Sequence, residues 1–201
     1  MNSALAIANY FVQSAIDQKM AGKDFPPSKV HGLVYLAHGW LLSSAGAAII
    51  KGEVMADRDG IFIPDLKAAG CWGTKNVTQL VSVVEMDDKR GLMVEQTPQL
   101  ARNNPTLSAL AWIWKTYGAL SSFSIGQHIK EAGSPWDQVW NDPARKGDEP
   151  RAVSNPAIRA WFKGLTGRRE EQKSISKLTR TQQLELHPKV EKTQLMPKRP
   201  K

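Results

Sequence analysis

The chain has 201 residues, 41% of them hydrophobic, with a mean hydropathy of -0.38 and a formal net charge of +8. This length suffices for one domain with a real core and is too short for two large ones. No run of ~18 or more uncharged apolar residues is present, so we expect a cytoplasmic protein without a membrane span. The single cysteine, Cys71, argues against a disulfide framework and a cysteine-cluster zinc site.

The positive charge is concentrated at the end of the chain. Residues 165–201 hold ten Lys or Arg against four Asp or Glu, whereas the first 164 residues hold 17 basic and 15 acidic residues. A nearly neutral globular part with a basic tail is a weak electrostatic footprint for a nucleic-acid-binding protein. We expect one domain over residues 1–164 and a basic, flexible tail over residues 165–201, with nucleic acid only weakly indicated as a partner.

The first predicted element is an amphipathic helix over residues 3–19. Ser3 stands where its hydroxyl can cap the first free N–H groups, and apolar residues follow at helical spacing. The central helix of the domain is its expected partner. Its expected buried side consists of Leu5, Ala8, Val12 and Ala15 or Ile16.

The strongest helical signal is the stretch from Phe25 to Gly46. Pro26 and Pro27 exclude helix before them, Ser28 can cap the first turn, and Gly46 supplies a left-handed stop. Between these ends, apolar residues recur at three- and four-residue spacing and widen beyond a single stripe. The pattern predicts one long buried helix at the centre of the domain.

The middle of the chain has a different pattern. Residues 47–64 are rich in glycine and β-branched side chains, which predicts short strands or extended connections. A brief helix is expected to start at Pro64 and to close at Gly70 or Gly73. Residues 77–96 then predict an antiparallel hairpin with turn formers between its strands.

The helical period resumes after Pro98. Residues 141–156 are dense in turn formers and predict a surface loop before the last helix. The predicted fold class is α+β and mostly helical: a compact helical domain with a small antiparallel β-hairpin and a basic C-terminal tail. The helices expected in this half run from about Asn104 to Gly118, from Ser121 or Ser122 to Gly133, from Pro135 to Trp140, and from Ser154 or Asn155 to about Leu165.

Two histidines and a tyrosine share one face of the predicted central helix. His31, Tyr35 and His38 stand at i, i+4 and i+7, so the histidines lie roughly 10 Å apart, too far for one metal ion. No HExxH-type motif accompanies them. We therefore predict neither a metal nor a cofactor, and a structural role for His38 through a hydrogen bond to a carbonyl or a neighbouring side chain. Tyr35 and Trp40 are predicted to be structural as well.

The seven tryptophans allow two interpretations. Large aromatic side chains can fasten short helices together in a core. Alternatively, those in short irregular segments are exposed contacts for a protein partner, because tryptophan is enriched among interface hot spots. The acidic residues of the turn near residue 58 are explained equally well as a solvated turn. The predicted partner-binding residues are Asp57, Arg58, Asp59, Trp72, Trp136 and Trp140.

No motif for catalysis is present in the sequence. Cys71 could act as a nucleophile only if His38 or His128 supplied a base in space, and a small buried hydrophobe is the favoured interpretation. Serine elbows, phosphate-binding loops and paired carboxylates at a suggestive spacing are absent. The sequence predicts a protein that is not an enzyme.

Three ordered blocks of the sequence resemble the SocA-like proteins, also called the Panacea domain family, which are phage-associated and antitoxin-like. SKVHGLVYLAHGW is similar to the family's KLQKLLYFAHGW, ALAIANYFVQSA to its IANYFI start, and the closing GSPW to its G-S-P-W. The resemblance covers residues 3–141. Asp57 and Ile61 depart from the aromatic and proline of the family's middle loop, and Ile129-Lys130 departs from its Thr-His pair.

The resemblance implies binding rather than catalysis. Members of the family serve as antitoxins paired with many unrelated toxins, and one is an adaptor that delivers its toxin to a ClpXP protease. The leading hypothesis is therefore an antitoxin or immunity-type protein that masks a partner toxin by direct binding. The alternatives are a phage or mobile-element protein that inhibits a host complex or acts as a proteolytic adaptor, and nucleic-acid binding through the tail.

Overall fold

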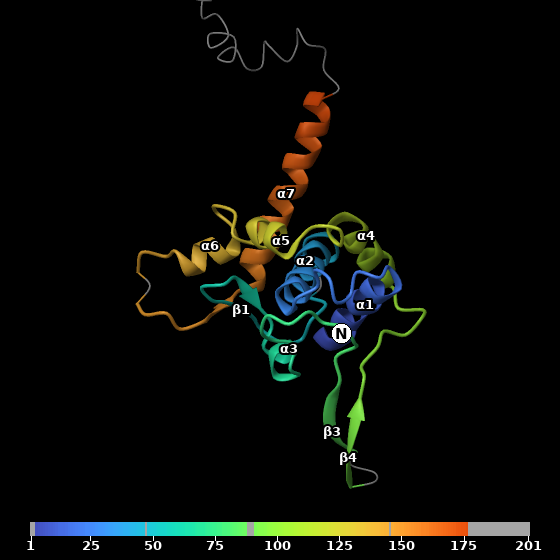
Figure 1. Cartoon of the computed structure of the whole chain (residues 1–201). Helices are drawn as coiled ribbons and strands as arrows, with labels where there is room; N and C mark the ends of the chain where they lie inside the picture. The colour runs from blue at the N-terminus through green and yellow to red at the C-terminus, as the bar shows by residue number, and fades with distance from the viewer. Residues whose placement is uncertain (1–2, 47, 88–90, 145, 177–201) are drawn as a thin grey trace, which may run out of the picture. The chain divides into compact units, whose positions relative to one another are not determined.

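The chain divides into two compact units, Met1–Phe162 and Lys163–Lys201. The division falls two residues before the boundary that the charge distribution predicts. In the first unit, helices surround a central helix and a small sheet, so the fold is α+β and mostly helical, as predicted (Figure 1). The computed structural model describes residues 3–46, 48–87, 91–144 and 146–176, with the backbone alone for residues 168–176.

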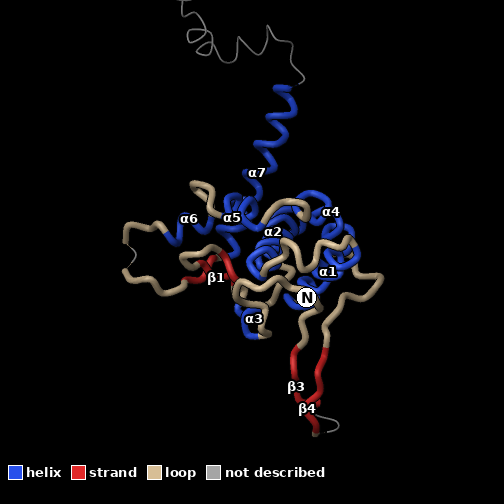
Figure 2. The backbone as a smooth tube through the Cα atoms, viewed as in Figure 1, coloured by secondary structure: helices blue, strands red, loops and turns tan. Residues whose placement is uncertain are grey.

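The described helices and strands alternate along the chain. The helices are α1 (Ala4–Asp17), α2 (Pro27–Ala45), α3 (Pro64–Ala68), α4 (Leu107–Tyr117), α5 (Ser122–Ile129), α6 (Pro135–Trp140) and α7 (Asn155–Ser176). The strands are β1 (Val54–Ala56), β2 (Ile61–Phe62), β3 (Val83–Asp87), β4 (Leu92–Gln96) and β5 (Arg151–Val153). Helices are the dominant element, and each strand is short (Figure 2).

Helix α2 is the centre of the first unit. It contacts α1, α4, α5 and β2, and most of its residues are buried, as the sequence predicts. Gly46 ends the helix with a left-handed backbone, φ 71°. The predicted cap was wrong: Pro26 is the N-cap and Pro27 the first helical residue, so Ser28 lies inside the first turn and makes no cap hydrogen bond.

Two glycines let other helices approach α2 closely. A Cβ at Gly32 would lie 2.6 Å from the Cγ2 of Ile125 on α5. A Cβ at Gly39 would overlap the ring of Phe162, near the end of the first unit. The Phe162 ring also meets Tyr35 and Trp40 edge-on, with centroid distances of 5.8 and 5.4 Å. The small residues of α2 therefore set how closely its neighbours pack.

Helix α1 packs on α2, and its buried face includes residues outside the predicted set. Ser3 caps it by accepting a hydrogen bond from the Ala6 N–H, as predicted. Leu5 and Ile16 are only half-buried, whereas Ile7 and Phe11 are fully buried. Ser121, one of the two predicted starts, caps α5 by the same kind of side-chain hydrogen bond, and Ser134 caps α6, which begins at Pro135 as predicted. Helix α5 ends at Ile129, short of the predicted Gly133.

A three-stranded antiparallel sheet in the order β2-β1-β5 lies beside α2. The short strands β1 and β2 were predicted, but β5 falls within residues 141–156, for which the sequence predicted only a surface loop. β5 pairs with β1 in a register that places Ala152 opposite Met55. Three residues carry too little local pattern to reveal a partner so distant in the sequence.

Helix α7 is longer than predicted. Ser154 caps it by accepting a hydrogen bond of 3.3 Å from the Ala157 N–H, one of the two predicted possibilities. The helix was expected to end near Leu165, but it continues through Gly164 and Gly167 to Ser176. A glycine inside a helix costs only about 1 kcal/mol, and no proline intervenes. The rest of the predicted tail lies outside the described residues.

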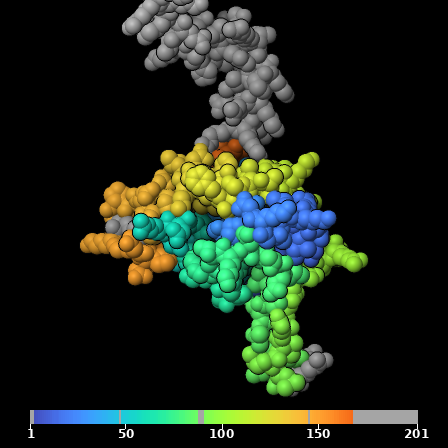
Figure 3. Space-filling model, viewed as in Figure 1, coloured from blue at the N-terminus to red at the C-terminus, as the bar shows by residue number. Residues whose placement is uncertain are grey.

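The hairpin of β3 and β4 stands out from the helices of the first unit (Figure 1, Figure 3). Its strands pair antiparallel over five residue pairs, as predicted, although β3 begins at Val83. Among the described residues, none of the helices combines the length and apolarity that crossing a bilayer requires.

Candidate functional site

The hairpin exposes large apolar side chains. Val84, Met86, Leu92 and Met93 are 61%, 58%, 62% and 61% exposed. Scattered single hydrophobic residues are normal on a protein surface, but a contiguous group marks an interaction site. All four lie on two adjacent short strands, and Val84, Met86 and Met93 form such a group on one side of them.

The strand register sorts these side chains into two faces. Val84 lies opposite Glu95, and Met86 opposite Met93. Because side chains alternate across a strand, these four residues share one side of the hairpin, which we call the hairpin face. At the base of the hairpin, the hydroxyls of Ser82 and Thr97 are hydrogen-bonded at 2.9 Å. Leu92 lies on the opposite side.

The hairpin is acidic in a basic chain. Its described strands carry charge only as the carboxylates of Glu85, Asp87 and Glu95. Residues 83–96 as a whole contain four acidic and two basic residues, against a net charge of +8 for the chain. The exposed apolar group is therefore accompanied by negative charge, which favours a partner with a positive surface.

A groove of about 570 Å³ runs between Trp72 and the base of the hairpin, and we call it the Trp72 groove. One wall is the segment from Val77 to Ser82 that leads into β3, and Glu95 of the hairpin face contributes to the lining. The other side is formed by Ala69–Trp72, after α3. The groove and the hairpin face thus share Glu95 and form one continuous surface.

Trp72 is held in place although 45% of its surface is exposed. Its ring meets Phe62 and His31 edge-on, with centroid distances of 5.6 and 5.9 Å. The ammonium of Lys67 lies 4.1 Å from the ring centroid, a cation–π contact. A fixed aromatic ring loses little conformational entropy on binding, so Trp72 has the properties of an interface anchor.

His31 fixes the segment that carries Trp72. Its Nδ1 accepts a hydrogen bond of 3.0 Å from the Ile63 N–H, so its Nε2 is the protonated nitrogen and donates to the Cys71 carbonyl at 2.8 Å. Burial lowers the pKa of His31 below its usual value. Both ring nitrogens are occupied by backbone groups on either side of α3, so this histidine positions Trp72.

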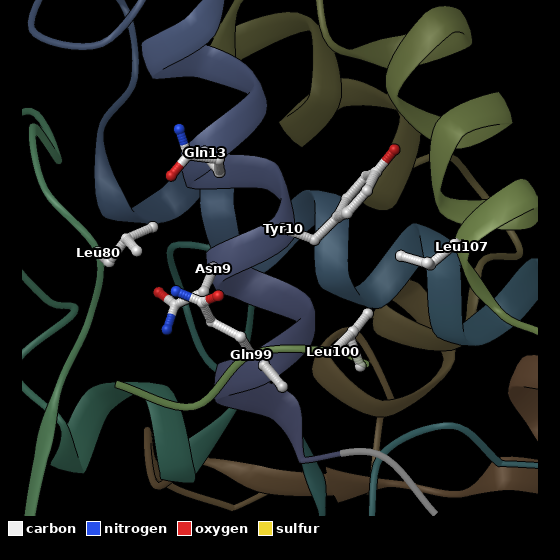
Figure 4. Close-up of a pocket in the computed structure, with 8 residues that line it drawn as sticks. Asn9, Tyr10, Gln13, Leu80, Gln99, Leu100 and Leu107 are labelled. Carbon is white, nitrogen blue, oxygen red and sulfur yellow. The ribbon is translucent and has the colours of Figure 1, made fainter. Parts of the chain in front are cut away.

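A buried amide attaches the base of the hairpin to helix α1. Asn9 of α1 donates from Nδ2 to the carbonyls of Val81 and Pro98, at 2.9 and 2.8 Å, and its Oδ1 accepts from the Val81 N–H at 2.8 Å. These residues lie just before β3 and just after β4. Figure 4 shows Asn9 in a small pocket with Leu80 on the incoming segment and Gln99 on the outgoing one. The amide fixes both legs of the hairpin.

The predicted contacts at Asp57, Arg58 and Asp59 form a tight turn between β1 and β2. The Asp57 carboxylate accepts hydrogen bonds from the N–H groups of Asp59 and Gly60 at 2.9 and 3.0 Å. Lys130 donates to the Arg58 carbonyl at 3.0 Å. Arg58 and Asp59 are exposed, and Asp57 is half-buried. The structure does not bring this turn into the Trp72 groove.

Trp136 is not the exposed anchor that the sequence predicted. It is only 7% exposed, because its indole N–H donates to the Asp57 carbonyl at 2.8 Å and its ring stacks on Trp140. Lys130 lies over the same ring, 5.0 Å from its centroid. Trp136 therefore holds the Asp57 turn in place, and Trp140 is half-buried beside it.

The residues predicted to be structural lie in the core or at its edge. The Nε2 of His38 is 2.9 Å from the Asn155 Oδ1, and burial lowers the pKa of His38. Trp40 donates from its indole N–H to the Tyr117 hydroxyl at 3.0 Å. Tyr35 is buried, and burial raises the pKa of its phenol. Among the described residues, the Tyr35 hydroxyl and the His38 Nδ1 have no hydrogen-bond partner.

Cys71 and the histidines do not form a reactive group. Cys71 is buried, and burial raises the pKa of its thiol to about 11. Its carbonyl, and not its sulfur, is the group that meets His31. In the described part of the chain, no group of three or more His, Cys, Asp or Glu side chains is placed to hold a metal ion.

Sequence reasoning found the hairpin but not its role as a surface. The signal was present: Val84, Met86, Leu92 and Met93 put large apolar side chains on both sides of a two-stranded element. Among the described residues, β3 and β4 form a sheet of two strands, with no third strand beside them. Only Trp72 of the predicted contacts belongs to this surface.

No family model, curated protein or solved structure matches the chain. The SocA-like resemblance therefore stays a prediction from the sequence blocks.

Proposed function

We propose that this chain is a non-enzymatic protein-binding module that neutralises a partner toxin by direct binding in the cytoplasm. The observation that supports this most is the exposure of Val84, Met86 and Met93, at 58–61% each, on one face of the hairpin. Removing apolar surface from water contributes about 25 cal/mol per Å² to a complex, before the entropy lost on association is subtracted. Trp72 adds a fixed aromatic ring at the end of the same surface.

The chemistry of the surface supports a role with variable partners. Met86 and Met93 lie opposite one another, and methionine is unbranched, polarizable and able to repack against different shapes. The SocA-like resemblance implies a scaffold that pairs with many unrelated toxins. A methionine pair flanked by carboxylates is a suitable contact for such a scaffold. The exposed Arg58 and Asp59 are proposed as a second, separate contact.

The test is an affinity pull-down of the tagged full-length chain from its native host, with mass spectrometry of the retained proteins. A double variant, Met86→Ser and Met93→Ser, removes the apolar part of the hairpin face. Phe123→Ser is the matched control, because Phe123 is 73% exposed on α5 and lies outside this surface. We expect one small protein from an adjacent gene, retained near stoichiometrically by the wild type and the control and at least tenfold less by the double variant.

Three results would contradict parts of the proposal. Equal retention by the double variant would remove the hairpin face from the interface. A large host assembly in place of a neighbouring gene product would replace the toxin by a host target or protease. Retention of nucleic acid alone, lost at high salt, would replace protein binding altogether.

A further inference from the structure

The outer edge of β3 has no strand partner among the described residues. Within the described chain, β3 pairs only with β4, so the backbone groups along its other edge face away from the two-stranded ladder. Natural proteins shield such edges with charged side chains, above all lysine, and with proline or bulges. Val83–Asp87 contains neither lysine nor proline, and its charged groups are carboxylates, which a basic strand would neutralise. Two strands alone are marginally stable in water, so a third strand would stabilise the hairpin.

The Trp72 groove continues from this same edge. The segment Thr78–Ser82, which leads into β3, forms one wall of the groove, and Trp72 lies on the other side. A strand added along β3 would therefore extend into the groove and reach the exposed ring.

The two faces of β3 specify different side chains on the added strand. On the hairpin face, its neighbours would be Val84 and Met86, which are apolar. On the opposite face, its neighbours would include Glu85, which is acidic. Because cross-strand pairs of opposite charge are favourable, the complementary strand alternates apolar and basic residues.

We propose that the partner contributes an extended segment of alternating apolar and basic residues, which adds as a third strand to the outer edge of β3 and ends against Trp72. This inference rests on the proposed function and names the part of the toxin that is bound. The added backbone hydrogen bonds supply affinity, and the alternation supplies specificity.

A second copy of this chain is the less favourable occupant. If β3 paired antiparallel with itself about its central residue, Glu85 would face Glu85 of the second copy. Like charges directly opposite one another destabilise a sheet. Charge complementarity therefore favours a basic strand over self-association.

The test uses a fluorescein-labelled peptide of alternating valine and lysine, eight residues long, and fluorescence anisotropy with the full chain. Two control peptides have the same side chains, but each carries N-methyl groups on one alternate set of amides. In an extended strand, alternate N–H groups point to opposite edges, so only one set can bond to β3. We expect one methylated peptide to bind at least tenfold more weakly and the other to stay within threefold of the parent.

Substitutions in the protein test the roles proposed for the Glu85 carboxylate and the Trp72 ring. Glu85→Lys is expected to weaken binding of the valine–lysine peptide at least tenfold, whereas Glu149→Lys, in an exposed loop far along the chain, serves as the matched control. Trp72→Ala is expected to weaken it about fivefold to tenfold. Circular dichroism of each variant checks that its helices are intact.

Several results would overturn strand addition. Equal affinities of the two methylated peptides, whether both high or both low, would contradict strand addition. They would show that the peptide binds through its side chains without backbone hydrogen bonds to β3. A valine–glutamate peptide that binds as well would remove the charge argument, and a stable dimer in sedimentation would assign the edge to a second copy. None of these depends on the pull-down, in which a toxin can still be captured by side-chain contacts alone.

Discussion

Asn9 and Val81 exchange two hydrogen bonds, of 2.9 and 2.8 Å, between the side chain of one and the backbone of the other. The remaining amide hydrogen of Asn9 goes to Pro98, so one side chain mimics a strand partner at the base of the hairpin. Asn9 is 2% exposed, and its partners are backbone groups that the hairpin cannot satisfy by itself. The Asn9 side chain therefore helps to hold in place the hairpin that carries the exposed apolar residues.

Asn9→Ala is expected to lower the free energy of unfolding by about 2–4 kcal/mol, because it leaves one N–H and two carbonyls without their partner. Urea denaturation followed by tryptophan fluorescence measures this. Asn141→Ala is the control, since Asn141 bonds Asp137 on the surface, and its cost is expected to be below about 0.5 kcal/mol. Equal costs for the two variants would contradict this role of Asn9.

Gly39→Ala is expected to destabilise the fold by about 1–3 kcal/mol, since the new methyl group overlaps the Phe162 ring. Gly126 is the matched glycine: nothing lies within 4 Å of its Cβ position on α5, so Gly126→Ala should stabilise by about 0.5–1 kcal/mol. In thermal melts, the melting temperature of Gly39→Ala should be lower than that of the wild type, and that of Gly126→Ala should be higher. In a Phe162→Leu background, the cost of Gly39→Ala should fall, and an unchanged cost would place the strain elsewhere.

Stability is expected to fall on acidification below about pH 6.5. Burial lowers the pKa values of His31 and His38 in the folded state, so the unfolded chain takes up protons first as the pH falls through the ordinary value of 6.5. At pH 5.5 each histidine costs up to about 1.4 kcal/mol relative to pH 7.5. Urea denaturation at both pH values measures the difference.

Single substitutions distinguish the contribution of His31 and His38 to this pH dependence from that of other titratable groups. His31→Gln and His38→Gln should each lose part of the dependence on pH. A pH dependence that is unchanged in both His31→Gln and His38→Gln would assign the effect to carboxylates.

The Cys71 thiol is expected to react slowly while the chain is folded. Because burial raises its pKa to about 11, the thiolate fraction at pH 8 is roughly two orders of magnitude smaller than for a free cysteine. The rate of alkylation by iodoacetamide should therefore rise at least 100-fold in denaturing urea. Similar rates in both conditions would show an accessible thiol.

The elements that the sequence predicted are those with local signals. Gly46 ended the central helix, and Ser3 and Ser134 capped two others, because a cap depends on a few neighbouring residues. The hairpin followed from alternation and turn formers. β5 and the extension of α7 were missed, since β5 depends on pairing with β1 and α7 tolerates two glycines.

The surface was harder to predict than the fold. Trp72 and Trp136 both lie in short irregular segments of the sequence, which does not tell which one is exposed. The indole N–H of Trp136 donates to the Asp57 carbonyl, a residue far away in the sequence. Met86 is exposed because no described element covers the hairpin face. The residues next to Met86 in the sequence do not reveal this. Burial is decided by tertiary contacts, so it had to come from the structure.

The position of β5 in the sheet determines when the sheet can be completed as the chain is synthesised. β1 is complete at Ala56, but the strand on its second side, Arg151–Val153, emerges from the ribosome only about 95 residues later. At roughly 5–20 residues per second, this leaves the edge of β1 open for about 5–20 seconds during synthesis. Phe162, which covers Gly39, arrives later still. The nascent domain therefore depends on nearly its whole length before its sheet and its central helix are both covered, and a ribosome that stalls within this interval leaves an open edge exposed to aggregation.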